Sequence, residues 1–173
     1  MGQRLSFSRI LKIIKKEDAE TITDLLVKCG FTLKRLDDGV FREVFEIVGS
    51  DVVVKVPKDG DGLCHASDEA KGWKIVHTSK HPAAVEARRH IPSRFAYDEP
   101  SGFIFMPKYQ VSKAHKYDNE MNRLNKLFRQ VICNGKKADI DLGASKYDNY
   151  GLDKHGKLVI LDMGCFTEDW WKS

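Results

Sequence analysis

The sequence lacks closely spaced pairs of cysteines, which excludes two classes of site. The 173 residues contain four cysteines, at Cys29, Cys64, Cys133 and Cys165. No two have the Cys-x-x-Cys spacing of a zinc ribbon or a redox motif, so free thiols in a reducing cytosol are the simplest interpretation. No apolar run has the length of a transmembrane helix or of a signal-peptide core. We therefore expect a cytoplasmic protein with no membrane partner.

An excess of either charge is also lacking. The 29 Lys and Arg and the 25 Asp and Glu give a formal net charge of +4. This permits phosphate or nucleic-acid binding without requiring it. Nucleic acid is the least favoured partner, because no strand pattern interleaves aromatic and basic residues. Hydrophobic residues, 42% of the chain, are enough for a core, and the length fits one domain with two small lobes.

Two kinds of periodicity divide the N-terminal part of the chain. Apolar residues at helical spacing predict a helical extension over residues 1–30, which Gly30 would end. The alternation that follows predicts an antiparallel meander with short polar turns. Its strands are expected at residues 31–36, 40–48 and 51–56.

A helix and two more strands are expected after the meander. Asp59–Gly62 is interpreted as a loop and residues 67–76 as a helix. Ser67 would cap that helix, which would place Glu69 in its first turn. The basic run Arg88–His90 predicts a solvated turn. Further strands at residues 91–97 and 103–106 would complete a five-stranded sheet.

The C-terminal part contains a long helix and a hairpin. Residues 119–133 form a strongly amphipathic helix, and Gly151–Gly164 predicts two strands joined by a tight turn. Asn149 precedes this hairpin, and Asp162 directly follows its buried second strand. Folding the hairpin back would bring Asn149 near Asp162. An amide oxygen and a carboxylate are hard ligands that suit Mg²⁺ carrying a phosphate chain.

These residues resemble elements of the protein kinase family. Asn149, the hairpin and Asp162-Met163-Gly164 are similar to the end of the catalytic loop and the Asp-Phe-Gly element. Gly39 and Phe41 have the spacing of the second half of a kinase glycine-rich loop. Val52-Val53-Val54-Lys55 resembles the Val-Ala-Ile-Lys strand. The parts occur in the family's order along the chain.

The resemblance implies a set of nucleotide-binding residues. Lys55 would bind the phosphates of ATP, and a helix carboxylate would orient it: Glu69 first, Asp68 second. Gly39 would present backbone N–H groups to the phosphates. Arg42 stands where the family's third glycine is expected, so it either contacts a phosphate or marks an altered loop. Taken alone, Lys55 also fits a lysine extending to solvent from an edge strand.

The resemblance also implies metal-binding and catalytic residues. Asn149 and Asp162 would hold Mg²⁺, and Asp141 would be the catalytic base. Rival bases are Asp139 and Asp148. Lys146 would neutralise the γ-phosphate. The loop departs from the family pattern, because the His-Arg pair is absent and the spacing from Asp141 to Asn149 is longer.

The fold implied is α+β and two-lobed, similar to a minimal protein kinase. A kinase-like N-lobe with a five-stranded antiparallel sheet and one helix is expected over residues 31–109, and a truncated C-lobe over 110–173. The resemblance is nearest to short kinase-like proteins of bacteriophages and bacterial effectors. It implies an ATP- and Mg²⁺-dependent phosphotransferase acting on Ser or Thr of a protein. The alternative is an inactive, pseudokinase module that binds a host or cellular protein in the host cytoplasm.

Overall fold

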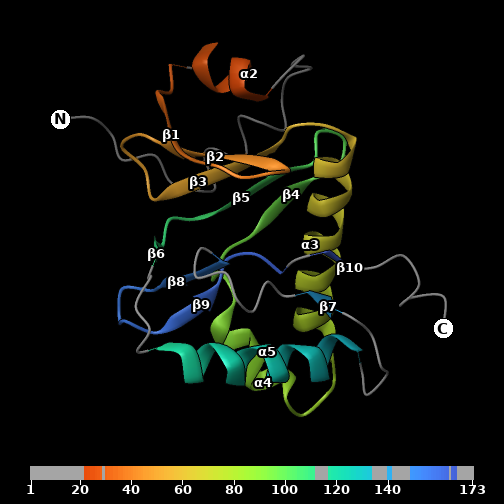
Figure 1. Ribbon diagram of the computed structural model, residues 1–173. Helices are drawn as coiled ribbons and strands as arrows, with labels where there is room; N and C mark the ends of the chain where they lie inside the picture. Colours follow the sequence, from red (N-terminus) through yellow and green to blue (C-terminus); the bar gives the residue numbers. More distant parts are fainter. Residues whose placement is uncertain are drawn as a thin grey trace. The chain divides into compact units, whose positions relative to one another are not determined.

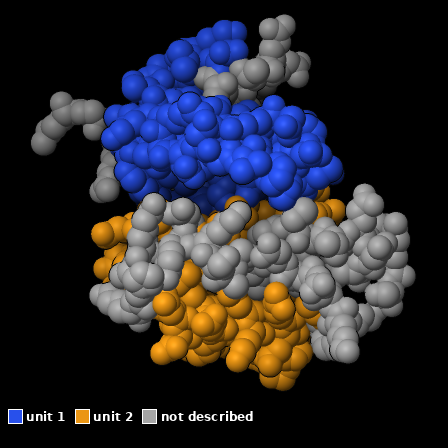
Figure 2. Space-filling model, viewed as in Figure 1, with its two compact units in different colours: residues 1–66, 94–108 blue, residues 67–93, 109–173 orange. Residues whose placement is uncertain are grey.

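The computed structural model describes residues 22–28, 30–111, 117–133, 140–141, 149–163 and 165–166. Its fold is α+β with a five-stranded antiparallel sheet, as expected from the sequence (Figure 1). The chain forms two compact units, coloured separately in Figure 2. Unit 1 contains the chain up to Ala66 together with Arg94–Lys108, and unit 2 contains Ser67–Ser93 and the chain from Tyr109 onward. Segment 67–93, which the sequence-based division assigned to the N-terminal lobe, thus groups with the C-terminal residues.

The sheet of unit 1 has the strand order β1-β2-β3-β5-β4. Its strands are β1 (Leu33–Asp38), β2 (Arg42–Ile47), β3 (Val52–Pro57), β4 (Ala96–Asp98) and β5 (Phe103–Pro107). Every neighbouring pair is antiparallel, which confirms the predicted meander. The strand predicted over residues 91–97 begins later than expected, at Ala96, because Ile91 and Pro92 are buried outside any strand and Ile91 belongs to the core of unit 2.

Both faces of this sheet are covered by apolar residues. Val52 and Val54 share one face with aromatic residues of β5 and with Leu26 of α2 (Ile22–Lys28). Val53 lies on the other face with Ile104 and with Ala66 of α3 (Gly60–Thr78). Successive valines of β3 thus point to opposite faces of the sheet and are buried on both, as in a strand within a sheet.

The end of α2 follows from one glycine. Gly30 has φ +81°, and its N–H donates to the carbonyl of Val27 at 2.9 Å. The N–H of Phe31 donates to the carbonyl of Leu26 at 2.8 Å. This pair of bonds satisfies carbonyls at the end of the helix and requires a left-handed residue, which Gly adopts without steric cost.

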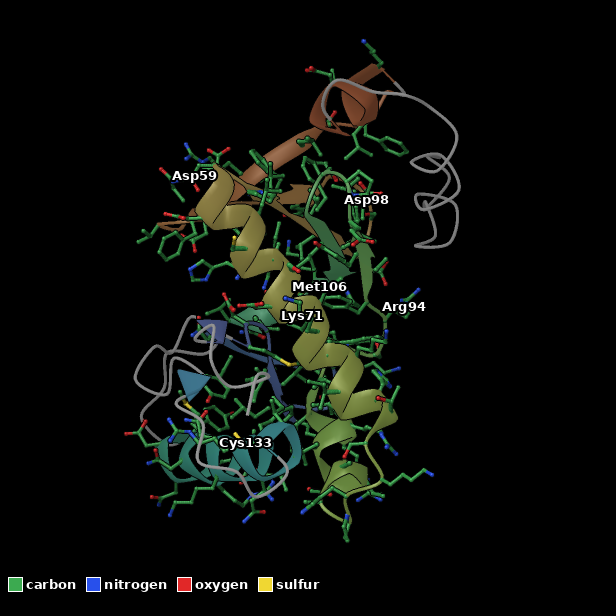
Figure 3. The ribbon with its side chains drawn as sticks, turned by 90° about the vertical axis from the view of Figure 1, so that its right-hand side faces the viewer. Asp59, Lys71, Arg94, Asp98, Met106 and Cys133 are labelled. Carbon is green, nitrogen blue, oxygen red and sulfur yellow. The ribbon has the colours of Figure 1, made fainter. Side chains whose placement is uncertain are left out.

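Helix α3 begins seven residues before the predicted start, at Gly60 instead of Ser67. The Oδ1 atom of Asp59 accepts a hydrogen bond from the N–H of Gly62 at 2.9 Å, so Asp59 is the cap and the predicted loop is the first turn (Figure 3). Glu69 consequently lies in the third turn and not the first.

The predicted solvated turn at Arg88–His90 is also wrong. It is a short 3₁₀ helix, η1, that follows α4 (Ala84–Ala87). The Arg88 side chain donates to the carbonyls of Val76 and Ser79, at 3.0 and 2.5 Å, which satisfies groups at the end of α3. His90 is buried.

Unit 2 is built around α5 (Asp118–Cys133), which matches the predicted amphipathic helix. Its buried residues pack with α4, with the end of α3 and with a sheet of order β6-β8-β9. The strands of unit 2 are β6 (Gln110–Val111), β7 (Ile140–Asp141), β8 (Tyr150–Leu152), β9 (Leu158–Ile160) and β10 (Cys165–Phe166). Strands β7 and β10 form a separate two-stranded sheet.

Candidate functional site

Lys55 occupies the central strand of the sheet in unit 1. It pairs with Val44 of β2 on one side and with Ile104 of β5 on the other. Only 6% of its surface is exposed. Lys55 is therefore not a lysine on an edge strand. An ammonium group is stable in such a position only when it is paired.

The β1–β2 hairpin tip contains the predicted glycine-rich loop. A Cβ atom on Gly39 would lie 3.0 Å from the carbonyl oxygen of Arg42, so the backbone passes close to itself at this point. The ring of Phe41 stacks on His65 of α3 with centroids 3.9 Å apart. The carbonyl oxygen of Phe41 accepts a hydrogen bond from the N–H of Lys58 at 3.0 Å. The tip is thus packed against the residues that follow β3 and begin α3.

Arg42 is buried, with 8% of its surface exposed, at the first position of β2 opposite Pro57. This burial was not expected from the sequence, because the family pattern has a glycine at this position. An arginine in this place keeps its charge at all physiological pH values. Arg42 on β2 is a second buried cation, on the strand next to the one that contains Lys55.

Glu69 lies on the buried stripe of α3. Among polar residues of that helix it is the least exposed, at 2%, and it shares its face with Gly62, Ala66 and Val76. Its rival Asp68 instead forms an ion pair with Lys71 on a partly exposed surface, with Oδ1 and Nζ 3.0 Å apart. The structure thus separates the two candidates, and Glu69 is the buried one. A first-turn role at the helix dipole is excluded by its position.

The β8–β9 hairpin joins the two predicted metal ligands through its backbone. Tyr150 pairs with Ile160, and the N–H of Leu161 donates to the carbonyl of Asn149 at 2.7 Å. Asp162 is the next residue. Asn149 and Asp162 therefore flank one end of the hairpin, and both are half-buried.

The turn of this hairpin has the predicted chemistry. Asp153 Oδ1 accepts hydrogen bonds from the N–H groups of His155 and Lys157, at 2.8 and 2.9 Å. Gly156 has φ +76°. These local bonds determine the register of the two strands, and the register brings Asn149 opposite Leu161.

Asp141, the predicted base, lies on β7, where its Cα partner on β10 is Cys165. The same small sheet therefore contains Asp141 and a residue three positions after Asp162. Lys146, the rival bases Asp139 and Asp148, and Gly164 lie outside the described residues.

Two buried polar contacts of unit 2 were not recognised in the sequence. His90 Nδ1 lies 2.8 Å from the carbonyl oxygen of Leu158, and its Nε2 lies 3.2 Å from Glu86 Oε1. The Tyr150 hydroxyl donates to Asn125 Oδ1 at 2.7 Å. The sequence did contain one signal for the second contact. Asn125 is a polar residue on the apolar face of α5, one turn from both Met121 and Phe128.

The donor set fits Mg²⁺ rather than a transition metal. In the described part of the chain, no group of three or more His, Cys, Asp or Glu side chains is placed to hold a metal ion. Asn149 and Asp162 provide oxygen atoms only, and Mg²⁺ is commonly bound through one or two such ligands with phosphate and water completing its shell. The described cysteines Cys64 and Cys133 form no disulfide.

Comparisons with known proteins do not assign a family: no protein-family model and no curated protein matches the chain. No helix within the described ranges has both the length and the apolar character needed to cross a membrane.

Proposed function

We propose that this protein is an ATP- and Mg²⁺-dependent phosphotransferase of the protein kinase-like type that acts on Ser or Thr of a protein. The observation that carries the proposal is the backbone bond between Leu161 and Asn149, which brings two hard oxygen ligands, Asn149 and Asp162, to one end of a hairpin. The burial of Lys55 on the central strand of its sheet supports a separate role for this lysine, binding of phosphate.

Each residue has a defined role in this reaction. Lys55 binds the α- and β-phosphates, and Glu69 orients its ammonium group. Gly39 presents backbone N–H groups to the phosphates, and Arg42 adds positive charge to the same strands. Asn149 and Asp162 hold Mg²⁺, which supplies charge neutralisation to the phosphate chain when bound.

The transfer step is an in-line displacement. The substrate hydroxyl oxygen bonds to the γ-phosphorus, the bond between that phosphorus and the β,γ-bridging oxygen breaks, and ADP leaves. Asp141 accepts the hydroxyl proton, and Lys146 neutralises charge on the γ-phosphate. Most of the rate gain comes from positioning and electrostatic stabilisation.

The direct test is incubation with γ-labelled ATP, Mg²⁺ and a cell lysate. We expect label transfer to protein by the wild-type chain and a loss of at least about 100-fold in the Asp162→Ala variant, since each well-placed electrostatic group typically contributes that much to rate. Glu99→Ala, which removes an exposed carboxylate outside the proposed site, is the control and retains full activity. Equal transfer by wild type and Asp162→Ala would overturn the proposal.

A second test concerns Lys55 and Glu69. If the two side chains act together, Lys55→Met, Glu69→Gln and the double variant will show strongly non-additive losses of ATP affinity. ATP affinity is measured as the rise in unfolding temperature at increasing ATP and Mg²⁺. Lys71→Ala on the exposed side of α3 serves as the control. Additive losses would contradict the assignment of both residues to one function.

An inactive kinase-like module that binds a host or cellular protein is the second candidate. The buried Arg42 favours it, because an arginine replaces a glycine of the family's phosphate-binding loop. For this candidate we expect stabilisation by ATP without label transfer. Both candidates place the protein in the cytoplasm, that of the host cell if the chain comes from a bacteriophage or an effector.

A further inference from the structure

A polar residue interrupts the apolar face of α5. Asn125 is only 6% exposed and lies within the core of unit 2, between Met121 and Phe128 on the same helix face. Its Oδ1 accepts a hydrogen bond from the hydroxyl of Tyr150 at 2.7 Å. Tyr150 is completely buried.

Only one end of the Asn125 amide has a hydrogen-bond partner in this core. Its Nδ2 atom is buried and has no hydrogen-bond partner within the described residues. A buried amide nitrogen without an acceptor destabilises a fold, and an apolar residue of similar size would pack better at this position. The contact with Tyr150 is therefore the feature that a replacement would lose.

Tyr150 lies directly after Asn149, where β8 begins. Asn149 precedes the strand and is partly exposed, whereas the side chain of the next residue, Tyr150, is held in the core. The carbonyl of Asn149 is held as well, by the N–H of Leu161. The backbone at Asn149 is thus restrained both by its own carbonyl and by the side chain of the next residue.

We propose that the hydrogen bond between Tyr150 and Asn125 positions Asn149 as a ligand of Mg²⁺. This inference rests on the proposed function, and it makes Asn125 and Tyr150 positioning residues that do not touch the metal. Residues that orient a metal ligand commonly change metal affinity by about 10–100-fold. The helix α5 would in this way determine the geometry of a site to which it contributes no ligand.

The test compares Tyr150→Phe, Asn125→Leu and the double variant. The unfolding temperature is measured during a Mg²⁺ titration at fixed ATP concentration. We expect all three variants to need at least about tenfold more Mg²⁺ for half of the stabilisation. The double variant should regain unfolding temperature relative to the single variants, because it leaves neither polar group without a partner. Val131→Ala, a cavity variant in the same helix and core, should lower the unfolding temperature without changing the Mg²⁺ requirement.

The outcomes separate this inference from the proposed function. Wild-type Mg²⁺ requirements in all three variants would overturn the positioning role alone. The positioning role would also be overturned if the Mg²⁺ requirement simply followed the unfolding temperature. In that case Val131→Ala would need more Mg²⁺ and the double variant would need as little as wild type, because the contact would then be structural only. A wild-type protein that ATP and Mg²⁺ do not stabilise would overturn the proposed function and this inference together.

Discussion

At the scale of the residue, a few polar and charged side chains are buried in this fold. Among the described residues, the buried polar or charged ones are Arg42, Lys55, Glu69, His90 and Asn125. Charged groups are seldom fully buried unless they are paired. The first three are residues that the sequence assigned to nucleotide binding by resemblance. Their burial makes them sensitive positions for substitution, since removal of one charge leaves its partner uncompensated.

The raised pKa of Tyr150 gives a prediction for alkaline solution. Burial raises this pKa to about 12, whereas an unfolded tyrosine loses its proton near pH 10. Stability from this group is therefore present below pH 10 and is lost as the pH rises from 10 towards 12. We expect the free energy of unfolding, measured by urea denaturation, to fall more steeply with pH above 10 in wild type than in Tyr150→Phe. Parallel pH profiles would contradict the stated origin of the shift.

At the scale of the element, the N-cap of helix α3 outweighs the low helix propensity of the residues in its first turn. Two glycines in the first turn, Gly60 and Gly62, are poor helix formers and hide the start of the helix in the sequence. The carboxylate of Asp59 satisfies the N–H of Gly62 at 2.9 Å and permits the helix to begin there. Ser67, the expected cap, is an interior residue.

Exchange of the two candidate caps for alanine distinguishes these alternatives. Asp59→Ala should lower the free energy of unfolding by about 0.5–2 kcal/mol, because it leaves the helix N-terminus without its acceptor. Ser67→Ala should be neutral or slightly stabilising, because alanine is the better interior residue. Urea denaturation of both variants gives the comparison. A larger loss for Ser67→Ala would place the start of the helix where the sequence suggested.

In the β8–β9 hairpin, residues close along the chain determine most of the structure. Asp153 and Gly156 form the turn, and the apolar run Leu158–Ile160 is completely buried. Because a turn of defined length sets the register, the position of Asn149 beside Leu161 follows from residues within the hairpin itself. This is why Asn149 and Asp162 could be predicted as neighbours from the sequence.

At the scale of the whole molecule, surface charge determines the response to acid. A hydrogen bond from His90 lowers the pKa of Glu86, and hydrogen bonds from Arg123 lower the pKa of Glu120. The unfolded chain takes up protons at these groups near pH 4.3, and the folded chain only at lower pH. Their contribution to stability is therefore complete above that range and is lost as the pH falls through the lowered pKa values.

The prediction is a fall in urea midpoint between pH 6 and pH 3 that is smaller in Glu120→Gln. High salt should also reduce the difference between wild type and variant, because these carboxylates are partly exposed and their ion pairs are screened. The variant Glu99→Gln, which changes an exposed acid for which no ion pair is described, is the matched control. An unchanged pH dependence in Glu120→Gln would exclude this origin of acid sensitivity.

The fold was predictable where periodicity is long and regular. The meander, helix α5 and the hairpin follow from apolar spacing and turn residues. The start of α3 and the short 3₁₀ helix with the buried His90 do not, because a cap and a long-range hydrogen bond outweigh the local pattern. In the candidate site, resemblance suggested Lys55 and Glu69, but Asn125 was missed because it lies within an apparently apolar stripe.

The sequence by itself determined the strands of the meander and the hairpin, the amphipathic helix and the neighbouring positions of Asn149 and Asp162, because each depends on residues close along the chain. Only the tertiary structure decided that Lys55 lies on a central strand, since β5, which flanks it, comes from a distant segment. It also decided the contact between Tyr150 and Asn125, which are 25 residues apart. Local periodicity specifies which face of an element is apolar, whereas the neighbours of that face are selected by packing of the whole chain.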